Sequence, residues 1–139
     1  MVAGRTAAAG RGALRPWASS APWVSGDIHL CRLEEIPDGG ARGFDPLREG
    51  RDTLMVIRQG TSLHAWRDAC PHMRGVPMAW RKDAYLNAGR DRIVCSAHGA
   101  LFDIATGLCT LGPCLGESLE PMSVRLESGS IFWRPRQPR

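Results

Sequence analysis

The fold of this chain is decided by two short stretches, Cys70-Pro71-His72 and Cys95-Ser96-Ala97-His98-Gly99. Each stretch offers one thiolate and one imidazole, and 22 residues lie between His72 and Cys95. Ligands of two kinds, delivered by two separate segments, predict a metal site that is built from two loops. The candidate ligands are Cys70, His72, Cys95 and His98.

The order of the ligands helps to distinguish between metals. Structural zinc sites usually use Cys-x2-Cys or His-x3-His pairs, in which both ligands of one segment reach a single ion. Here each segment is mixed instead. A mixed pair suits a two-iron cluster in which the cysteines hold one iron and the histidines hold the other, because each loop then contacts both irons. Zinc remains the alternative at this point.

At these residues the chain resembles the Rieske [2Fe-2S] family. The resemblance covers roughly residues 27–134 and continues through Phe102-Asp103, Thr106-Gly107 and Gly112-Pro113-Cys114. It implies one [2Fe-2S] cluster, held by Cys70, His72, Cys95 and His98. The implied fold is all-β: an antiparallel β-sandwich base with a small cluster-binding subdomain inserted at about residues 68–114. The resemblance also implies that Gly112-Pro113 lies over the cluster.

The length and the charge of the chain limit its functions. With 139 residues it can bury one sizeable core, so we expect one domain over residues 27–134, an N-terminal extension over 1–26 and a tail over 135–139. The net charge of +4 comes from arginines near the two ends, and residues 27–133 sum to −2. Nucleic-acid binding is therefore not indicated. The sequence contains no run of 18 or more apolar residues, and this argues against a membrane span.

The first 26 residues are rich in Ala, Gly, Ser and Arg and contain no acidic residue. They lack the unbroken apolar core of about 7 to 15 residues that a secretory signal needs. We therefore expect a cytoplasmic protein with a disordered extension, and an organellar transit peptide is the alternative reading of residues 1–26.

Short apolar runs that are separated by turn residues predict an all-β domain. The predicted strands are residues 28–33, 53–59, 62–67, 92–95, 100–103, 122–127 and 131–133. A polar loop is expected from Pro37 to Asp52, and residues 73–90 are expected to form an ordered loop. The cysteines expected in the core are Cys31, Cys109 and Cys114, and the tryptophans expected either in the core or as shields of the cluster are Trp66, Trp80 and Trp133.

Four departures from the respiratory Rieske proteins imply a low reduction potential. Those proteins carry a disulfide between the two ligand loops, at positions that correspond here to Gly75 and Ala97. They also place a serine and a tyrosine hydroxyl near the cluster, where this chain has Ala100 and Phe102. Because hydrogen bonds to sulfur stabilise the more negative reduced cluster, their loss lowers the potential. In this respect the chain resembles the oxygenase-associated ferredoxins.

The resemblance implies a single-domain ferredoxin that carries one electron between a reductase and an oxygenase or another redox enzyme, without being a catalyst itself. The alternative is a module that uses the Cys/His site for structure or redox sensing, with a cluster or with zinc. A complete oxygenase would need two further histidines and a carboxylate in another domain, and only His29 and His64 remain.

Redox partners are expected to dock over His72 and His98, on the surface made by the two ligand loops and the Gly112-Pro113 loop, since electron transfer needs a short path. Apolar contacts are expected from Met73, Val76, Pro77 and Met78, although inward packing of Val76 and Met78 is an open alternative. The charges expected to steer an acidic partner are Arg74, Arg81 and Lys82.

Overall fold

The computed structural model describes residues 27–71, 78–97 and 99–135. In these residues nine strands form three antiparallel sheets of three strands each. The first sheet, in the order β2-β10-β9, contains β2 (Ile28–Arg32), β9 (Ser123–Glu127) and β10 (Ser130–Arg134). The second, in the order β3-β4-β5, contains β3 (Ala41–Phe44), β4 (Leu54–Gln59) and β5 (Ser62–Arg67). The third contains β6 (Arg92–Cys95), β7 (Ala100–Asp103) and β8 (Cys109–Leu111). A short 3-10 helix, η2 (Leu33–Glu35), follows β2.

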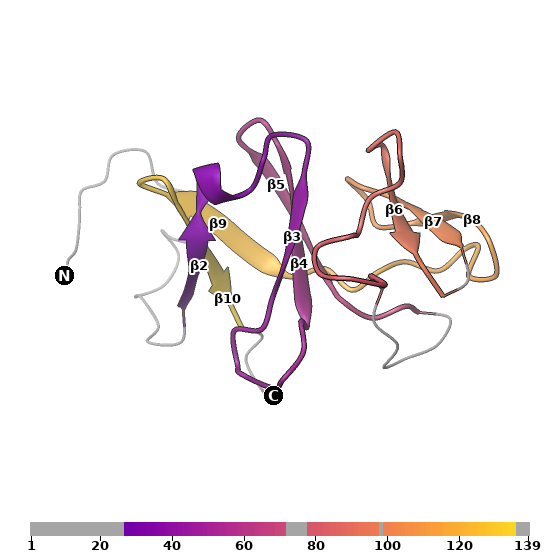
Figure 1. Cartoon of the computed structure of the whole chain (residues 1–139), viewed down its shortest axis with the longest axis horizontal. Helices are drawn as coiled ribbons and strands as arrows, with labels where there is room; N and C mark the ends of the chain where they lie inside the picture. Colours follow the sequence, from indigo (N-terminus) through magenta and orange to yellow (C-terminus); the bar gives the residue numbers. More distant parts are fainter. Residues whose placement is uncertain (1–26, 72–77, 98, 136–139) are drawn as a thin grey trace.

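The second sheet lies between the other two, and both of its faces are covered (Figure 1). Four consecutive residues of β4, Leu54–Ile57, are buried. Leu54 and Val56 belong to a first core shared with the first sheet, whereas Met55 and Ile57 belong to a second core shared with the third sheet. An unbroken apolar run in β4 is what a strand with two buried faces requires, because neighbouring side chains point to opposite faces.

The first core makes a sandwich of the first two sheets. Its buried residues are Cys31, Ile36, Phe44, Leu54, Val56, Ala65, Ile131 and Trp133. Ala65 of β5 lies in this core, and its neighbour Trp66 lies in the second core. The indole Nε1 of Trp66 donates a hydrogen bond to the carbonyl oxygen of Ile104 at 3.0 Å. This bond ties the sandwich to the turn that follows β7 and so helps to hold the third sheet in position.

The all-β fold class and its antiparallel sandwich base are confirmed, and so are the seven predicted strands to within a residue or two. The polar loop predicted from Pro37 to Asp52 is wrong in part, because it contains strand β3. Strand β3 carries Arg42 and Gly43, which are poor strand signals. Gly43 is needed there because a Cβ atom would overlap the Tyr85 hydroxyl and the Asp52 carboxylate.

Two further predictions need correction. Strand β8 falls in a segment for which no strand was predicted, and its three residues are too few to show a pattern. Trp80 was expected in the core or as a shield of the cluster. The core alternative is wrong, because its side chain is 72% exposed and the Arg81 guanidinium lies 4.8 Å from its ring centroid. Trp66 and Trp133 are buried as expected. Among the described residues, no helix has the length and apolar character that crossing a membrane requires.

Candidate metal centre

The two candidate cysteine ligands lie in the same core. Cys70 follows β5, Cys95 is the last residue of β6, and both are 0% exposed within the second core. Such burial suits thiolates that hold an iron cluster away from water. The other two candidate ligands, His72 and His98, lie outside the described residues, as do Met73, Arg74, Gly75, Val76 and Pro77.

The hairpin of β6 and β7 shapes the second ligand segment. Cys95 is paired with Ala100 across this hairpin. The backbone N–H of Gly99 donates to the carbonyl oxygen of Cys95 at 2.7 Å, and Gly99 has a φ of 71°. This left-handed conformation favours glycine because it carries no Cβ. The sequence Cys95 to Gly99 therefore encodes a tight turn whose first residue is the candidate ligand.

The backbone of Met78 joins the two ligand segments. Its N–H donates to Asp68 Oδ1 at 2.8 Å, and its carbonyl oxygen accepts from the N–H of Ser96 at 2.9 Å. Asp68 comes two residues before Cys70, and Ser96 comes directly after Cys95. A chain of two hydrogen bonds thus connects the segments that respiratory Rieske proteins join by a disulfide. Met78 itself is 0% exposed, so of its two predicted alternatives inward packing is confirmed and contact with a partner is wrong.

A buried carboxylate and a buried phenol support this connection. Tyr85 Oη donates to Asp68 Oδ2 at 2.7 Å, and Asp68 is only 7% exposed. Burial raises the pKa of Asp68, while the hydrogen bonds from Met78 and Tyr85 act in the opposite direction. Burial also raises the pKa of Tyr85, and the neighbouring Asp68 adds to this effect. Neither residue was singled out from the sequence, since a lone Asp and a lone Tyr carry no spacing signal.

The Gly112-Pro113 segment packs against the second ligand hairpin. Gly112 has a φ of 111°, and a Cβ at this position would lie 2.8 Å from the Cα of Ala100. The segment therefore approaches β7 at the residue that pairs with Cys95. Whether it also covers a cluster, as the resemblance implies, stays a prediction.

Cys109 and Cys114 are buried, as predicted, and join the same core as Cys70 and Cys95. Burial raises the pKa of Cys114 to about 12, and the neighbouring thiols of Cys109 and Cys70 add to this effect. All five cysteines of the chain are free thiols in the structure.

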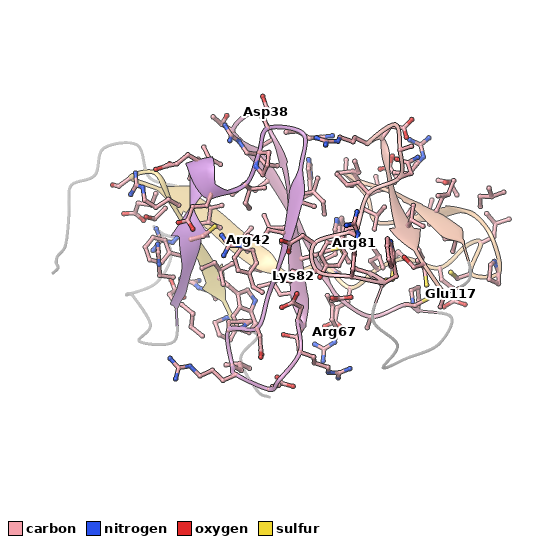
Figure 2. The ribbon with its side chains drawn as sticks, in the orientation of Figure 1. Asp38, Arg42, Arg67, Arg81, Lys82 and Glu117 are labelled. Carbon is pink, nitrogen blue, oxygen red and sulfur yellow. The ribbon has the colours of Figure 1, made fainter. Side chains whose placement is uncertain are left out.

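The charges near the first ligand segment are partly neutralised. Lys82 Nζ lies 3.0 Å from Asp52 Oδ2 and 3.0 Å from Asp83 Oδ1, and it also donates to the Gly43 carbonyl oxygen at 2.6 Å. Arg81 and Lys82 both come from the segment between the second and third sheets (Figure 2). Two carboxylates thus compensate part of the Lys82 charge, and its role in steering a partner stays a prediction.

The described part of the site fits a [2Fe-2S] cluster. Cys70 and Cys95, both without exposed surface, lie in one apolar core, and their segments are connected through the backbone of Met78. A cavity of about 490 Å³ opens beside the first segment, and Asp68, Cys70 and Pro71 are among its lining residues. The site can therefore hold a buried, thiolate-ligated group next to a partly open surface.

Comparisons with known proteins agree with this geometry. A family model described as the Rieske [2Fe-2S] domain matches residues 27–127. Apoptosis-inducing factor 3 from Homo sapiens is 29% identical over 105 residues, which are 76% of this chain and 16% of that protein. Ferredoxin CarAc from Metapseudomonas resinovorans is 27% identical over 105 residues, which are 76% of this chain and 90% of that protein. The chain thus matches only a small part of the human protein but most of the bacterial one.

A solved structure extends the comparison to three dimensions. The ferredoxin of carbazole 1,9a-dioxygenase from Nocardioides aromaticivorans IC177 superposes with a TM-score of 0.63 and 25% identity. The alignment covers 81% of this chain and 100% of the ferredoxin. The similarity therefore extends over most of this chain and over the whole of that ferredoxin.

Proposed function

The chain belongs to the Rieske [2Fe-2S] domain family, and from this premise we propose that it is a ferredoxin, carrying one electron from a reductase to an oxygenase or another redox enzyme. The observation that carries the proposal is the burial of Cys70 and Cys95 at 0% exposure in one core. CarAc and the Nocardioides protein are both ferredoxins, and each matches this chain over most of its own length.

As a member of the family, the chain carries one [2Fe-2S] cluster. We assign its ligands as Cys70 and Cys95 for one iron and His72 and His98 for the other. Bound there, the cluster takes up and releases a single electron, and its histidine-bound iron is the one that is easier to reduce. The protein supplies the buried thiolates and the two joined ligand segments, and no catalytic residue is assigned to it.

The domain division follows the same assignment. Residues 27–134 form the Rieske domain, and residues 68–114 form its cluster-binding part, which holds the third sheet and both ligand segments. Residues 1–26 and 135–139 are an extension and a tail. A cytoplasmic location and the absence of nucleic-acid binding are part of this proposal.

The reduction potential tests the functional class. We expect a value near the low end of the Rieske range, about −150 mV rather than +300 mV. Ala100 and Phe102 are both 0% exposed and cannot donate hydroxyl hydrogen bonds, and Ala97 cannot form a loop disulfide. Voltammetry at neutral pH measures this potential directly. A clearly positive value would place the chain with the respiratory proteins instead.

A small apolar surface lies beside the proposed site. We define it by Leu111, Pro113 and Leu115, which are exposed at the end of β8 and on either side of Gly112. Leu111 is 60% exposed and Leu115 is 67% exposed. Exposed apolar patches mark sites of protein interaction. Short-lived electron-transfer complexes bury small interfaces, which suits a small patch of this kind. We propose that a redox partner docks here, next to the ligand segments.

Replacing Leu115 with aspartate is expected to slow electron delivery at least about fivefold, as truncation of an important interface residue does. Stopped-flow oxidation of the reduced protein by an oxygenase component encoded by a neighbouring gene measures the rate. Leu47→Asp is the matched control, because Leu47 is 54% exposed but lies on the β3–β4 connection of the sandwich. Equal rates for the two variants would remove Leu115 from the docking surface, and no transfer by the unmodified protein would count against the ferredoxin function itself.

A further inference from the structure

Trp80 is the most exposed large apolar side chain among the described residues. It is 72% exposed, against 7% for Trp66 and 8% for Trp133. The Arg81 guanidinium lies over its ring, 4.8 Å from the centroid. Single exposed leucines are common on protein surfaces, but tryptophan and arginine are the residue types in which the binding energy of interfaces is concentrated. Trp80 has no role in the proposed function, so its exposure needs another explanation.

The backbone on both sides of Trp80 is held in place. Before it, the backbone of Met78 forms hydrogen bonds with both ligand segments. After it, the N–H of Ala84 donates to the carbonyl oxygen of Arg81 at 3.1 Å and closes a turn. Two residues of extended chain span at most about 7 Å, so Trp80 stays close to the Met78 connection. A protein bound at Trp80 would therefore lie near the ligand segments.

Lys82 and Asp83 fix the same turn to the sandwich base. The N–H of Gly43 donates to Asp83 Oδ1 at 2.8 Å, and the carbonyl oxygen of Gly43 accepts a hydrogen bond from Lys82 Nζ at 2.6 Å. Gly43 lies in β3, at the outer edge of the second sheet, so the two side chains take the place of a further strand. A side chain presented by a fixed backbone loses less conformational freedom on binding. Trp80 is therefore preorganised for an interface.

The charges of this turn leave Arg81 available to another protein. Lys82 Nζ lies 3.0 Å from a carboxylate oxygen of Asp52 and 3.0 Å from one of Asp83. Among the described residues no carboxylate pairs with Arg81, whose guanidinium lies over the Trp80 ring instead. An arginine can form two parallel hydrogen bonds with a carboxylate, and such charge-assisted bonds are strong. The complementary surface is an apolar recess for the indole, bordered by an aspartate or a glutamate.

We propose that Trp80 and Arg81 form an anchor that binds a redox partner, a reductase or an oxygenase that presents such a recess with a carboxylate at its edge. This inference rests on the proposed function, because it takes the bound protein to be a redox partner. The anchor adds a second contact to the apolar surface of Leu111, Pro113 and Leu115.

Replacing Trp80 with alanine is expected to weaken binding to the partner at least about tenfold, as the loss of a central interface residue does. The side chain is mostly exposed, so iron content and reduction potential are expected to stay unchanged. Trp80→Phe keeps an aromatic ring and is expected to retain most of the affinity. Arg81→Gln removes the charge and is expected to weaken binding more at low ionic strength than at high ionic strength.

The experiment uses the full iron-loaded chain, with the reductase and the oxygenase component that neighbouring genes encode. Isothermal titration calorimetry measures the dissociation constant for each partner, and stopped-flow spectroscopy measures the rate of electron transfer with each. Phe132→Ala is the matched control. Phe132 also stacks with an arginine, since the Arg125 guanidinium lies 4.7 Å from its ring centroid, but it belongs to β10 in the first sheet. The second sheet separates it from the ligand segments (Figure 1).

An affinity loss of tenfold or more with at least one partner, absent from Phe132→Ala, would support the anchor. Equal dissociation constants for wild type and Trp80→Ala with both partners would overturn it, and so would an equal loss in Phe132→Ala. Failure of the unmodified chain to exchange electrons with either partner would instead refute the proposed function.

Discussion

Replacing either Cys70 or Cys95 with serine is expected to leave the purified protein with far less than the two irons and two labile sulfides of a [2Fe-2S] cluster. Both sulfurs are 0% exposed, so neither water nor buffer can easily take the place of a lost thiolate. A serine oxygen is also a poor substitute, since iron–sulfur clusters select soft thiolate ligands. Iron and sulfide analysis of anaerobically prepared protein, with the visible absorption spectrum, measures the loss. Substitution of His72 or His98 is expected to act in the same direction.

Two other cysteines provide the controls for this experiment. Cys31→Ser alters a thiol that is 3% exposed in the first core, on the other side of the second sheet. Cys109→Ser alters a thiol in the second core itself. Both variants are expected to keep two irons per chain, with at most a moderate loss of stability from the buried hydroxyl. A full complement of iron in Cys70→Ser would reject the ligand assignment, and stoichiometric zinc in the wild type would reject the cluster.

The strands that could be predicted are those with a clear local pattern. Strand β4 has an unbroken apolar run, and β9 and β10 are joined by the Ser128-Gly129 turn. Strand β3 was missed because Arg42 and Gly43 are poor strand signals, and β8 was missed because its three residues are too few to show a pattern. Gly43 illustrates the reason. Its lack of a side chain is required by Tyr85, which is 42 residues away in the sequence, and no local pattern can report such a contact.

The candidate site shows the same division between local and distant information. The spacing of cysteine and histidine in each ligand segment was enough to predict the cluster and its family. The way in which the two segments are joined was not predictable, because it uses the backbone of Met78 and the carboxylate of Asp68. Backbone groups carry no residue identity, and one acidic residue near a ligand is common. Trp80 was misplaced because its size suggested burial, whereas it stacks with Arg81 at the surface.

Asp68→Ala is expected to have the second large effect, by leaving two buried donors without partners. The N–H of Met78 and the hydroxyl of Tyr85 both donate to the Asp68 carboxylate, at 2.8 and 2.7 Å. An unsatisfied buried donor costs about 1–3 kcal/mol, so the free energy of unfolding should fall by about 2–5 kcal/mol. This is a large part of the 5–15 kcal/mol that stabilises a typical domain. Denaturant titration of the iron-loaded protein measures the change.

Asp45→Ala is a matched control for this loss. Asp45 also accepts two backbone hydrogen bonds, from Glu49 at 2.7 Å and Gly50 at 2.8 Å, but both are exposed. Water can replace the lost carboxylate there, so we expect a change of about 1 kcal/mol or less and no effect on the cluster. The difference between the two variants isolates the cost of burial from the cost of losing an Asp.

A comparison of Asp68→Ala with Tyr85→Phe tests whether the connection through Met78 protects the cluster. Tyr85→Phe removes the hydroxyl but leaves the bond from the Met78 N–H to Asp68, and with it the connection between the two ligand segments. We expect both variants to lose stability, but only Asp68→Ala to release iron to a chelator several-fold faster than wild type under conditions in which all three proteins remain folded. Among the described backbone hydrogen bonds, Met78 contacts the second ligand segment only through the N–H of Ser96. Loss of Asp68 therefore removes the hydrogen-bonded connection through Met78 between the segment that carries Cys70 and the one that carries Cys95. Equal rates of iron release from the two variants would show that this connection contributes only to general stability.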